Sequence, residues 1–200
     1  MLGAALIATP AFAQTPAKTG TPATTPAAVQ TAIFAGGCFW CIEADFEKLP
    51  GVIKVESGYT AGRTPNPTYN QVSAGGTGHT EAVRVEFDAS RVSYEKLVDY
   101  FWRHIDPTVK DAQFCDMGAH YRSGIYYQGD EQKRIAEASK AALEKSGRFP
   151  KIHTELVPAS AFYLAEEYHQ DYYKKNPIRY NYYRKGCGRD ARVAELWGTK

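Results

Sequence analysis

The residues with the clearest chemical potential are two cysteines, Cys38 and Cys41, within the stretch AIFAGGCFWCIEADFE. A Cys-x-x-Cys pair can form a redox disulfide, supply half of a zinc site, or contain one reactive thiol beside a bystander. Cys38 follows a short apolar strand and two glycines, at the expected start of a helix. Because backbone N–H groups at a helix amino end stabilise a thiolate, Cys38 is the candidate nucleophile. The alternative is a buried cysteine that packs as a small hydrophobic side chain.

A candidate acid, Glu81, opens a segment of alternating polarity. Its side chain shares parity with Val83, Val85 and Phe87, so we expect all four on the buried face of one strand. Burial raises the pKa of a carboxyl group, which then donates a proton near neutral pH. The alternative is that Glu81, at a strand end, simply reaches water.

Two long irregular stretches carry further polar candidates. The first contains Tyr69 and His79, and the second contains Cys115, Asp116 and Tyr121. Phenol groups donate hydrogen bonds to polar oxygens, and an imidazole can act as a base. Loops of this length in a compact domain are usually functional or disordered, so both are candidate site loops.

The elements that must position these residues follow from hydrophobic periodicity. The predicted order is β-α-β-β-α-β-α-β-α, with Ser93 as the cap of the second helix. This order indicates an α+β fold, in which helices cover a small sheet of mixed strand directions. The predicted strands are 31–37, 52–59, 81–88, 124–128 and 152–159, and the predicted helices are 38–49, 93–105, 130–147 and 165–176.

Composition excludes several other classes of protein. The 200 residues carry a net charge of +2, with 44% hydrophobic and 23% charged residues, which is typical of one globular domain. No basic block predicts nucleic-acid binding, and no apolar run reaches the ~18 residues of a membrane span. Four cysteines are too few for a disulfide-framework protein.

The amino end differs from the rest of the chain. Residues 1–13, MLGAALIATPAFA, resemble the apolar core and small-x-small cleavage site of a signal peptide, although no basic residue precedes Lys18. Residues 14–30 form a linker rich in Pro, Thr and Ala, and residues 31–200 form the single domain. We therefore expect a periplasmic or secreted protein whose mature chain begins near Gln14; the alternative is a cytoplasmic protein with an apolar tail.

Five motifs in order resemble the A-type peptide-methionine sulfoxide reductases: GGCFWC, SGYTAG, NPTYNQVSAGGTGHTEAV, DMGAHYRSGIY and AEEYHQDYYKKNP. The likeness extends from about Ile33 to Trp197. It implies a two-layer α+β sandwich with a mixed sheet around a ferredoxin-like core. It also implies an enzyme that reduces the S epimer of methionine sulfoxide, free or in oxidised proteins.

The resemblance implies a role for each candidate. Cys38 matches the catalytic cysteine and Glu81 the acid that protonates the sulfoxide oxygen. The substrate-binding positions are two aromatics around the methyl group, two phenols that hydrogen-bond the oxygen, and one pocket acid: Phe39, Trp40, Tyr69, Tyr121 and Asp116.

The chemistry of such an enzyme needs a second thiol. Attack by Cys38 produces methionine and a cysteine sulfenic acid, which a second thiol converts to a disulfide. An external, thioredoxin-like dithiol then reduces that disulfide. The resemblance implies no bound cofactor or metal, and we expect a monomer.

Three cysteines are candidates for the resolving thiol. Cys187 is preferred because it lies near the carboxyl end, where glycines on both sides would let a tail swing toward Cys38. Cys41 closes a shorter loop, which favours it entropically, but helix geometry must let the sulfurs meet. Cys115, next to Asp116, is third. A Cys38–Cys187 disulfide is therefore predicted after turnover.

Two other functions compete with this one. A general thiol–disulfide oxidoreductase also has a Cys-x-x-Cys pair at a strand–helix junction, but Glu81 and the tyrosines would have no task in it. A zinc protein braced by all four cysteines would normally contain two such pairs, and this chain has one.

Overall fold

The structure is a computed structural model that describes residues 28–198. The predicted signal peptide and most of the predicted linker lie outside the described residues. The first strand, β1 (Val29–Gly36), begins two residues before the predicted start of the domain at Thr31.

A six-stranded mixed sheet runs through the domain in the order β7-β6-β1-β3-β2-β8. Neighbouring strands are antiparallel, except that β6 and β7 are parallel. The register pairs Phe34 of β1 with Val83 of β3 and with Ile125 of β6. The other strands are β2 (Val52–Thr60), β3 (Thr80–Asp88), β6 (Ser123–Tyr127), β7 (Glu155–Pro158) and β8 (Tyr163–Leu164).

The central part of this sheet confirms the ferredoxin-like core. The order β1-α1-β2-β3-α3-β6 along the chain gives four antiparallel strands in the spatial order β6-β1-β3-β2. The remaining strands, β7 and β8, extend the sheet at its two edges. The predicted α+β fold class is therefore confirmed.

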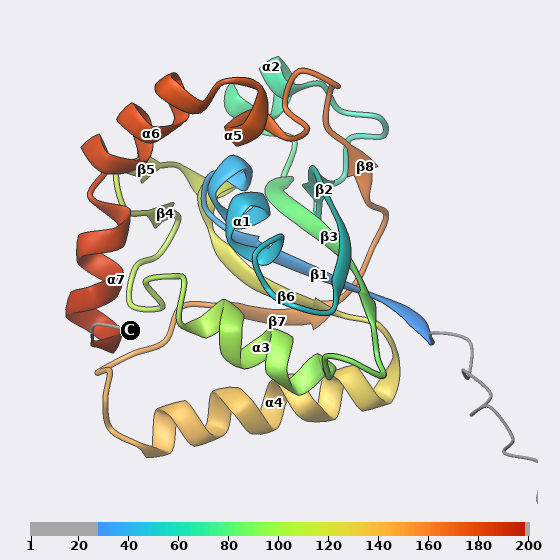
Figure 1. The fold of residues 1–200 in the computed structure, drawn as a ribbon, viewed down its shortest axis with the longest axis vertical. Helices are drawn as coiled ribbons and strands as arrows, with labels where there is room; N and C mark the ends of the chain where they lie inside the picture. Colours follow the sequence, from blue (N-terminus) through green and yellow to red (C-terminus); the bar gives the residue numbers. More distant parts are fainter. Residues whose placement is uncertain (1–27, 199–200) are drawn as a thin grey trace, which may run out of the picture.

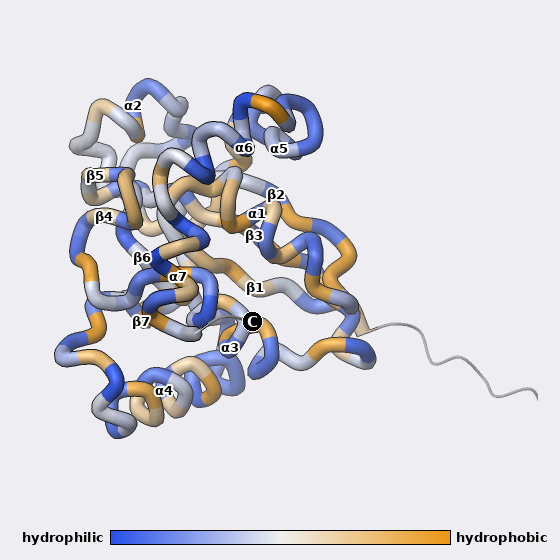
Figure 2. The backbone as a smooth tube through the Cα atoms, turned by 60° about the vertical axis from the view of Figure 1, so that its left-hand side comes forward, coloured by the Kyte–Doolittle hydropathy of each residue, from blue (hydrophilic) through white to orange (hydrophobic). Residues whose placement is uncertain are grey.

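Three helices cover one face of the sheet: α1 (Phe39–Phe46), α3 (Tyr94–Trp102) and α4 (Gly129–Lys145) (Figure 1). The Ser93 hydroxyl caps α3 by accepting the N–H of Lys96 at 3.2 Å, as predicted. Hydrophobic segments gather at β1 and α1, whereas hydrophobic and hydrophilic residues alternate along α4 (Figure 2). The layer between them is filled by large buried side chains, among them Phe34, Ile42, Phe46, Val85, Leu97 and Phe101.

The two irregular stretches contain short elements that the sequence analysis did not predict. A helix, α2 (Tyr69–Ser73), begins in the first stretch at a capping box in which Thr68 and Gln71 satisfy each other's backbone N–H groups. In the second stretch, β4 (Ala112–Gln113) and β5 (Asp116–Met117) form a hairpin, and a single 3-10 turn, η1 (Ala119–Tyr121), follows it.

The predicted helix over 165–176 is wrong for most of its length. The structure has turns up to Asp171, whose φ of 53° breaks the helical path, and then a four-residue helix, α5 (Tyr172–Lys175). The polar side chains of this segment bond to other parts of the fold. The Gln170 amide both accepts the N–H of Ser57 and donates to its carbonyl, each at 2.9 Å. These tertiary contacts outweigh the local preference for helix.

The expectation of a swinging carboxyl-terminal tail is also wrong. Residues after Asn176 form α6 (Pro177–Gly186) and α7 (Arg189–Trp197), which lie along the side of the domain (Figure 1). Pro177 occupies the first turn of α6, where its missing N–H costs nothing. Gly188, at φ 68°, makes the turn between the two helices. Within residues 28–198, no helix combines the length and the apolar character needed to cross a membrane.

Candidate active site

Cys38 is the N-cap of α1, at the end of the Gly36–Gly37 turn. Gly37 has a φ of 81°, and a Cβ atom there would lie 2.5 Å from the Cβ of Gln113. A Cβ atom on Gly36 would lie 2.5 Å from Ile42 Cδ1. Both positions therefore require glycine, which brings the backbone close to the 112–117 hairpin and directs the chain into the helix.

The Cys38 thiol is buried, with 6% of the residue exposed. Burial raises its pKa well above the ordinary value, and the neighbouring Cys41 and Glu81 act in the same direction. This corrects the expectation of a resting thiolate, because desolvation outweighs the backbone donors of the helix end. The resting enzyme holds Cys38 as a thiol.

Cys41 lies one turn into α1 and hydrogen-bonds with Cys38. This hydrogen bond lowers the pKa of Cys41; burial opposes the change, and the guanidinium groups of Arg189 and Arg184 add to it. Arg184 also forms a 2.9 Å ion pair with Asp45, deeper in the same helix. The second cysteine therefore lies on the positively charged side of the first.

Glu81 faces the core side of the sheet, as its strand parity predicts, and only 1% of it is exposed. Its Oε2 atom accepts the backbone N–H of Phe39, the residue after Cys38, at 3.0 Å. Burial raises the pKa of Glu81 to about 8; the Phe39 hydrogen bond opposes this, and Asp116 and Cys41 reinforce it. Glu81 therefore does not reach water, and it is protonated at neutral pH.

The two aromatics between the cysteines lie in different environments. Phe39 is 1% exposed and packs in the core, with its ring 5.9 Å from that of Tyr59. Trp40 is half-buried, stacks on Tyr172 at 3.6 Å between ring centres, and donates its Nε1–H to His169 Nδ1 at 3.0 Å. Trp40 is thus the more accessible wall, and Phe39 supports the site from within.

The structure brings the two predicted phenols together. Tyr69 and Tyr121 hydrogen-bond with each other, although they come from α2 and η1. Burial raises the pKa of both, and the charges of Glu81 and Cys38 raise it further. Both hydroxyls therefore stay protonated and can donate a hydrogen bond near the reactive sulfur.

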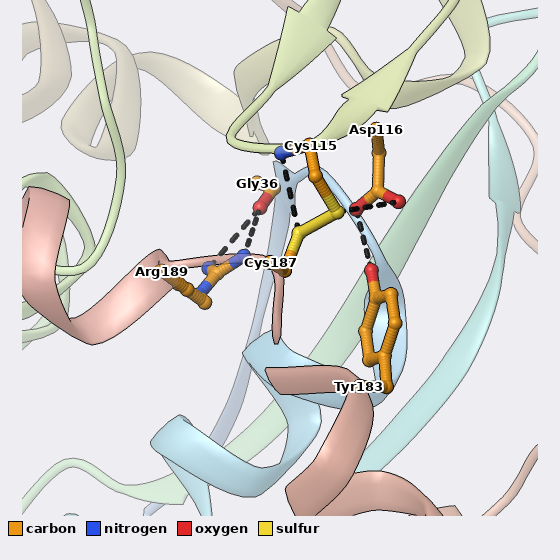
Figure 3. Close-up of a disulfide and its surroundings, with 6 residues drawn as sticks. All are labelled: Gly36, Cys115, Asp116, Tyr183, Cys187 and Arg189. Atoms are coloured by element: carbon orange, nitrogen blue, oxygen red, sulfur yellow. Dashed lines mark hydrogen bonds between the residues drawn. A yellow bond between two sulfur atoms is a disulfide. The ribbon is translucent and has the colours of Figure 1, made fainter. Parts of the chain in front are cut away.

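Tyr183 of α6 is a site residue that the sequence analysis missed. Its hydroxyl donates to Asp116 Oδ2 at 2.5 Å, and it also hydrogen-bonds with Cys38 (Figure 3). Burial raises the pKa of Asp116 as well, and the Tyr183 hydrogen bond partly offsets this. The only signal in the sequence was its position, four residues before Cys187 on one helical face.

Two more missed residues hold the site in place. Arg189 is 2% exposed and donates to the Gly36 carbonyl at 3.2 Å and to the His104 carbonyl at 2.9 Å (Figure 3). Glu166 accepts the Tyr59 hydroxyl and the backbone N–H of Tyr69, both at 2.8 Å. Sequence reasoning had no signal for either, since each acts through partners more than 90 residues away.

Cys115 and Cys187 are joined by a disulfide, whereas Cys38 and Cys41 are free thiols (Figure 3). The sequence analysis weighed Cys187, Cys41 and Cys115 only as partners of Cys38, so it did not consider this pair. Cys115 is exposed and lies next to Asp116, while Cys187 follows the last residue of α6.

Two other expectations meet the structure here. His79 serves the loop rather than the reactive sulfur, because its Nε2 atom bonds with the Thr64 carbonyl at 2.8 Å. A zinc site of all four cysteines is wrong, since two of them are bonded to each other. Within the described part of the chain, the candidate metal-ligand groups are Cys115, Asp116 and Cys187, and Glu43, Glu47 and Asp171.

A buried thiol beside a protonated carboxyl group, two phenols and an aromatic wall defines a class of enzyme that reduces a polar oxygen by cysteine attack. Comparisons with known proteins agree. The family described as peptide methionine sulfoxide reductase matches residues 30–200. The curated MsrA of Bacillus licheniformis is 51% identical over 172 residues, covering 86% of this chain and 95% of that protein.

Solved structures give the same result. Mxr1 from Saccharomyces cerevisiae in reduced form is 33% identical with a TM-score of 0.69, covering 76% of this chain and 88% of that chain. Methionine sulfoxide reductase A of Corynebacterium diphtheriae is 36% identical with a TM-score of 0.68, covering 78% of each chain. Mxr1 has also been solved in complex with Trx2 (23% identity, TM-score 0.50). This chain belongs to the peptide methionine sulfoxide reductase family, in its A type.

Proposed function

We propose that this protein reduces the S epimer of methionine sulfoxide, free or within oxidised proteins, to methionine. The observation that carries the proposal is the pairing of Cys38 with Glu81. The carboxyl group is protonated near neutral pH and bonds to the backbone immediately after the buried thiol. A sulfoxide oxygen is a poor leaving group until it is protonated, so the reaction needs both groups.

In the proposed reaction the Cys38 sulfur attacks the substrate sulfur while Glu81 protonates the oxygen. The bond from the substrate sulfur to oxygen breaks, methionine leaves, and the oxygen remains on Cys38 as a sulfenic acid. The thiol proton of Cys38 replaces the one that Glu81 gave up. Cys41, which is hydrogen-bonded to Cys38 and lies near two guanidinium groups, is the first acceptor on that path.

The pocket residues give the proposed site its choice of epimer. Trp40, with Phe39 behind it, holds the methyl group, while the hydroxyls of Tyr69 and Tyr121 donate to the sulfoxide oxygen. Asp116 orients Tyr183 on the opposite side through their 2.5 Å hydrogen bond. Fixing both the methyl group and the oxygen selects one handedness at the sulfur.

The structure favours a two-step resolution of the sulfenic acid. Cys187 attacks it, releasing water and forming a Cys38–Cys187 disulfide. The Cys115 thiolate then attacks Cys187, which restores Cys38 and forms the Cys115–Cys187 disulfide of the structure. The support is positional: Gly37 abuts Gln113, two residues before Cys115, and Arg189, two residues after Cys187, bonds to Gly36.

We propose a thioredoxin-like dithiol protein as the reductant of this final disulfide. Cys115 is exposed, and Met117 and Tyr182, on the neighbouring segments, are 73% and 84% exposed. Exposed apolar side chains beside a disulfide suit a protein partner. The complex of the yeast relative with Trx2 supports the same partner class. The site needs no second copy of the chain and no bound cofactor or metal, so we expect it to act as a monomer.

The activity is tested by assaying wild type and Cys38→Ser with the separate S and R epimers of methionine sulfoxide and a dithiol reductant. We expect turnover of the S epimer only, and none with the serine variant. Equal turnover of the two epimers, or an active serine variant, would refute the proposal.

The relay is tested by peptide mapping after one turnover without reductant. Wild type should accumulate Cys115–Cys187, and Cys115→Ser should stop at Cys38–Cys187. A Cys38–Cys41 bridge in either protein would show that the resolving thiol lies within α1. The corresponding control, Cys41→Ser, should still form the Cys115–Cys187 bridge.

We also propose export, with a mature chain that begins near Gln14, on the strength of the apolar run and the Ala-Phe-Ala site. Amino-terminal sequencing of the protein isolated from its source tests this. A chain that retains Met1 in the cytosolic fraction would contradict export.

A further inference from the structure

Three ligand-bearing side chains meet at the disulfide, apart from the reaction at Cys38. The sulfurs of Cys115 and Cys187 and a carboxylate oxygen of Asp116 all lie within 4.8 Å of one another. Two residues adjacent in sequence thus meet a third from 72 positions away. In the oxidised protein the two sulfurs are bonded to each other, so neither is available as a thiolate ligand.

We propose that the reduced form of this protein binds one zinc ion through Cys115, Cys187 and Asp116. Two thiolates and one carboxylate are a suitable donor set for zinc, whereas magnesium and calcium prefer oxygen ligands alone. Tetrahedral zinc holds two thiolate sulfurs roughly 3.8 Å apart, given a metal–sulfur bond of about 2.3 Å. Side-chain rotation after reduction can provide that separation. Water completes the fourth position.

The surroundings favour a cation bound at these ligands. Cys187 caps the carboxyl end of the ten-residue helix α6, where the helix dipole favours positive charge. Tyr183 holds one oxygen of Asp116, which orients the carboxylate as outer-shell donors commonly do in metal sites. The other oxygen faces the Cys115 sulfur at 3.8 Å.

Entry and thiolate formation are also provided for. Cys115 is exposed, so the ion reaches the site from solvent. The backbone N–H of Cys115 donates to Cys187 Sγ at 3.2 Å, a hydrogen bond that would stabilise a thiolate there. The guanidinium of Arg189, which lies over the Phe114 ring, weakens cation binding to some extent but lowers the cost of ionising the thiols.

The second acidic group of the fold does not compete on equal terms. Glu43, Glu47 and Asp171 lie close together, but Lys174 already pairs with Glu47 at 2.6 Å and with Asp171 at 2.7 Å. Its ammonium group occupies the place of a cation. The group that includes the two cysteines has no lysine of this kind among its printed partners within residues 28–198.

The binding step is balanced by proton release. An external dithiol reduces the Cys115–Cys187 disulfide and itself becomes a disulfide. Zinc then displaces two thiol protons, so the reduced protein releases two protons per ion bound. Zinc on these residues leaves Cys38 free but withholds both thiols of the proposed relay. Binding itself does not depend on the proposed reductase activity.

The experiment titrates zinc into reduced protein freed of dithiol under anaerobic conditions, in competition with a chromogenic chelator. Cobalt serves as a second probe, since thiolate ligation gives it ultraviolet charge-transfer bands. We expect one ion per reduced chain and no tight binding by the oxidised chain. Asp116→Asn should weaken binding at least tenfold, in line with the loss of one charged ligand.

The other thiol pair requires a control, because reduced Cys38 and Cys41 could also bind a metal. The Cys38→Ser/Cys41→Ser double variant should keep stoichiometric zinc, and Cys115→Ser/Cys187→Ser should lose it. The opposite pattern would move the metal to α1 and overturn the proposal, as would a reduced wild type that binds no zinc. Circular dichroism of each variant establishes that it is folded.

Discussion

Glu81 and Cys38 share one task at the scale of single residues: one supplies a proton and the other an electron pair. The buried carboxyl group has no other partner that needs its proton, since the hydrogen bond that it accepts comes from the Phe39 backbone. That backbone contact would survive replacement by an amide. An amide at this position therefore isolates the acid function from the packing.

We expect Glu81→Gln to slow formation of the Cys38 sulfenic acid by about 10²- to 10⁴-fold, the usual contribution of a general acid. The side-chain volume and the Phe39 contact stay the same, so substrate binding should change little. Single-turnover assays measure the rate. Glu86→Gln, on the other face of β3, is the matched control, and wild-type rates in Glu81→Gln would remove Glu81 from the mechanism.

The same residue predicts the pH dependence of the reaction. Its pKa is raised to about 8, so the proton that the reaction needs is present below that pH and lost above it. The rate of the single-turnover step should therefore fall as the pH rises through about 8. The fall should be missing in Glu81→Gln, and its persistence there would assign it to another group.

At the scale of elements, sequence patterns predicted those that bury a regular stripe. The alternation in 81–88 placed Glu81 correctly because every second residue of β3 faces the core. The stripe in α3 and the turn before Cys38 succeeded for the same reason. The 165–176 segment failed because Gln170 and its neighbours satisfy distant backbone groups instead of each other.

The buried Glu43 ties α1 to that same irregular segment. It accepts the N–H of Asp171 at 3.1 Å and the hydroxyl of Ser57 at 3.3 Å. Burial raises its pKa from 4.5 to about 7. Between these values the unfolded chain loses its proton first, so the folded state becomes less stable as the pH rises.

We expect Glu43→Gln to remove this loss. The variant should gain roughly 1–3 kcal/mol relative to wild type between pH 4.5 and pH 8, since one pKa unit corresponds to about 1.4 kcal/mol. Urea unfolding at several pH values measures the difference. Glu137→Gln, on the exposed side of α4, is the control, and parallel curves for Glu43→Gln and wild type would contradict the prediction.

At the scale of the whole molecule, the family resemblance predicted the ferredoxin-like core and the residues around Cys38. The carboxyl-terminal helices were beyond local patterns, because Arg189 and Tyr183 act on partners that only the folded chain brings near. The Cys115–Cys187 pair was missed for the same reason: 72 residues separate the two cysteines.

The disulfide should make the oxidised protein markedly more stable than the reduced one. A bridge across 72 residues restricts the unfolded chain by roughly 4 kcal/mol in the chain-entropy description. Guanidinium unfolding with and without dithiol measures the difference in wild type. The Cys115→Ser/Cys187→Ser variant should show none, and a wild type indifferent to dithiol would argue against this estimate.

The stacking of Trp40 on Tyr172 gives the protein an optical property. Of the three tryptophans, Trp40 alone borders the reactive thiols, whereas the indoles of Trp102 and Trp197 bond to Ser139 and to the Ile105 carbonyl. Its emission depends on the sulfur chemistry beside it and on whatever displaces water from its open face. The enzyme thus carries a built-in fluorophore, and each stage of its cycle can be followed in real time without a label.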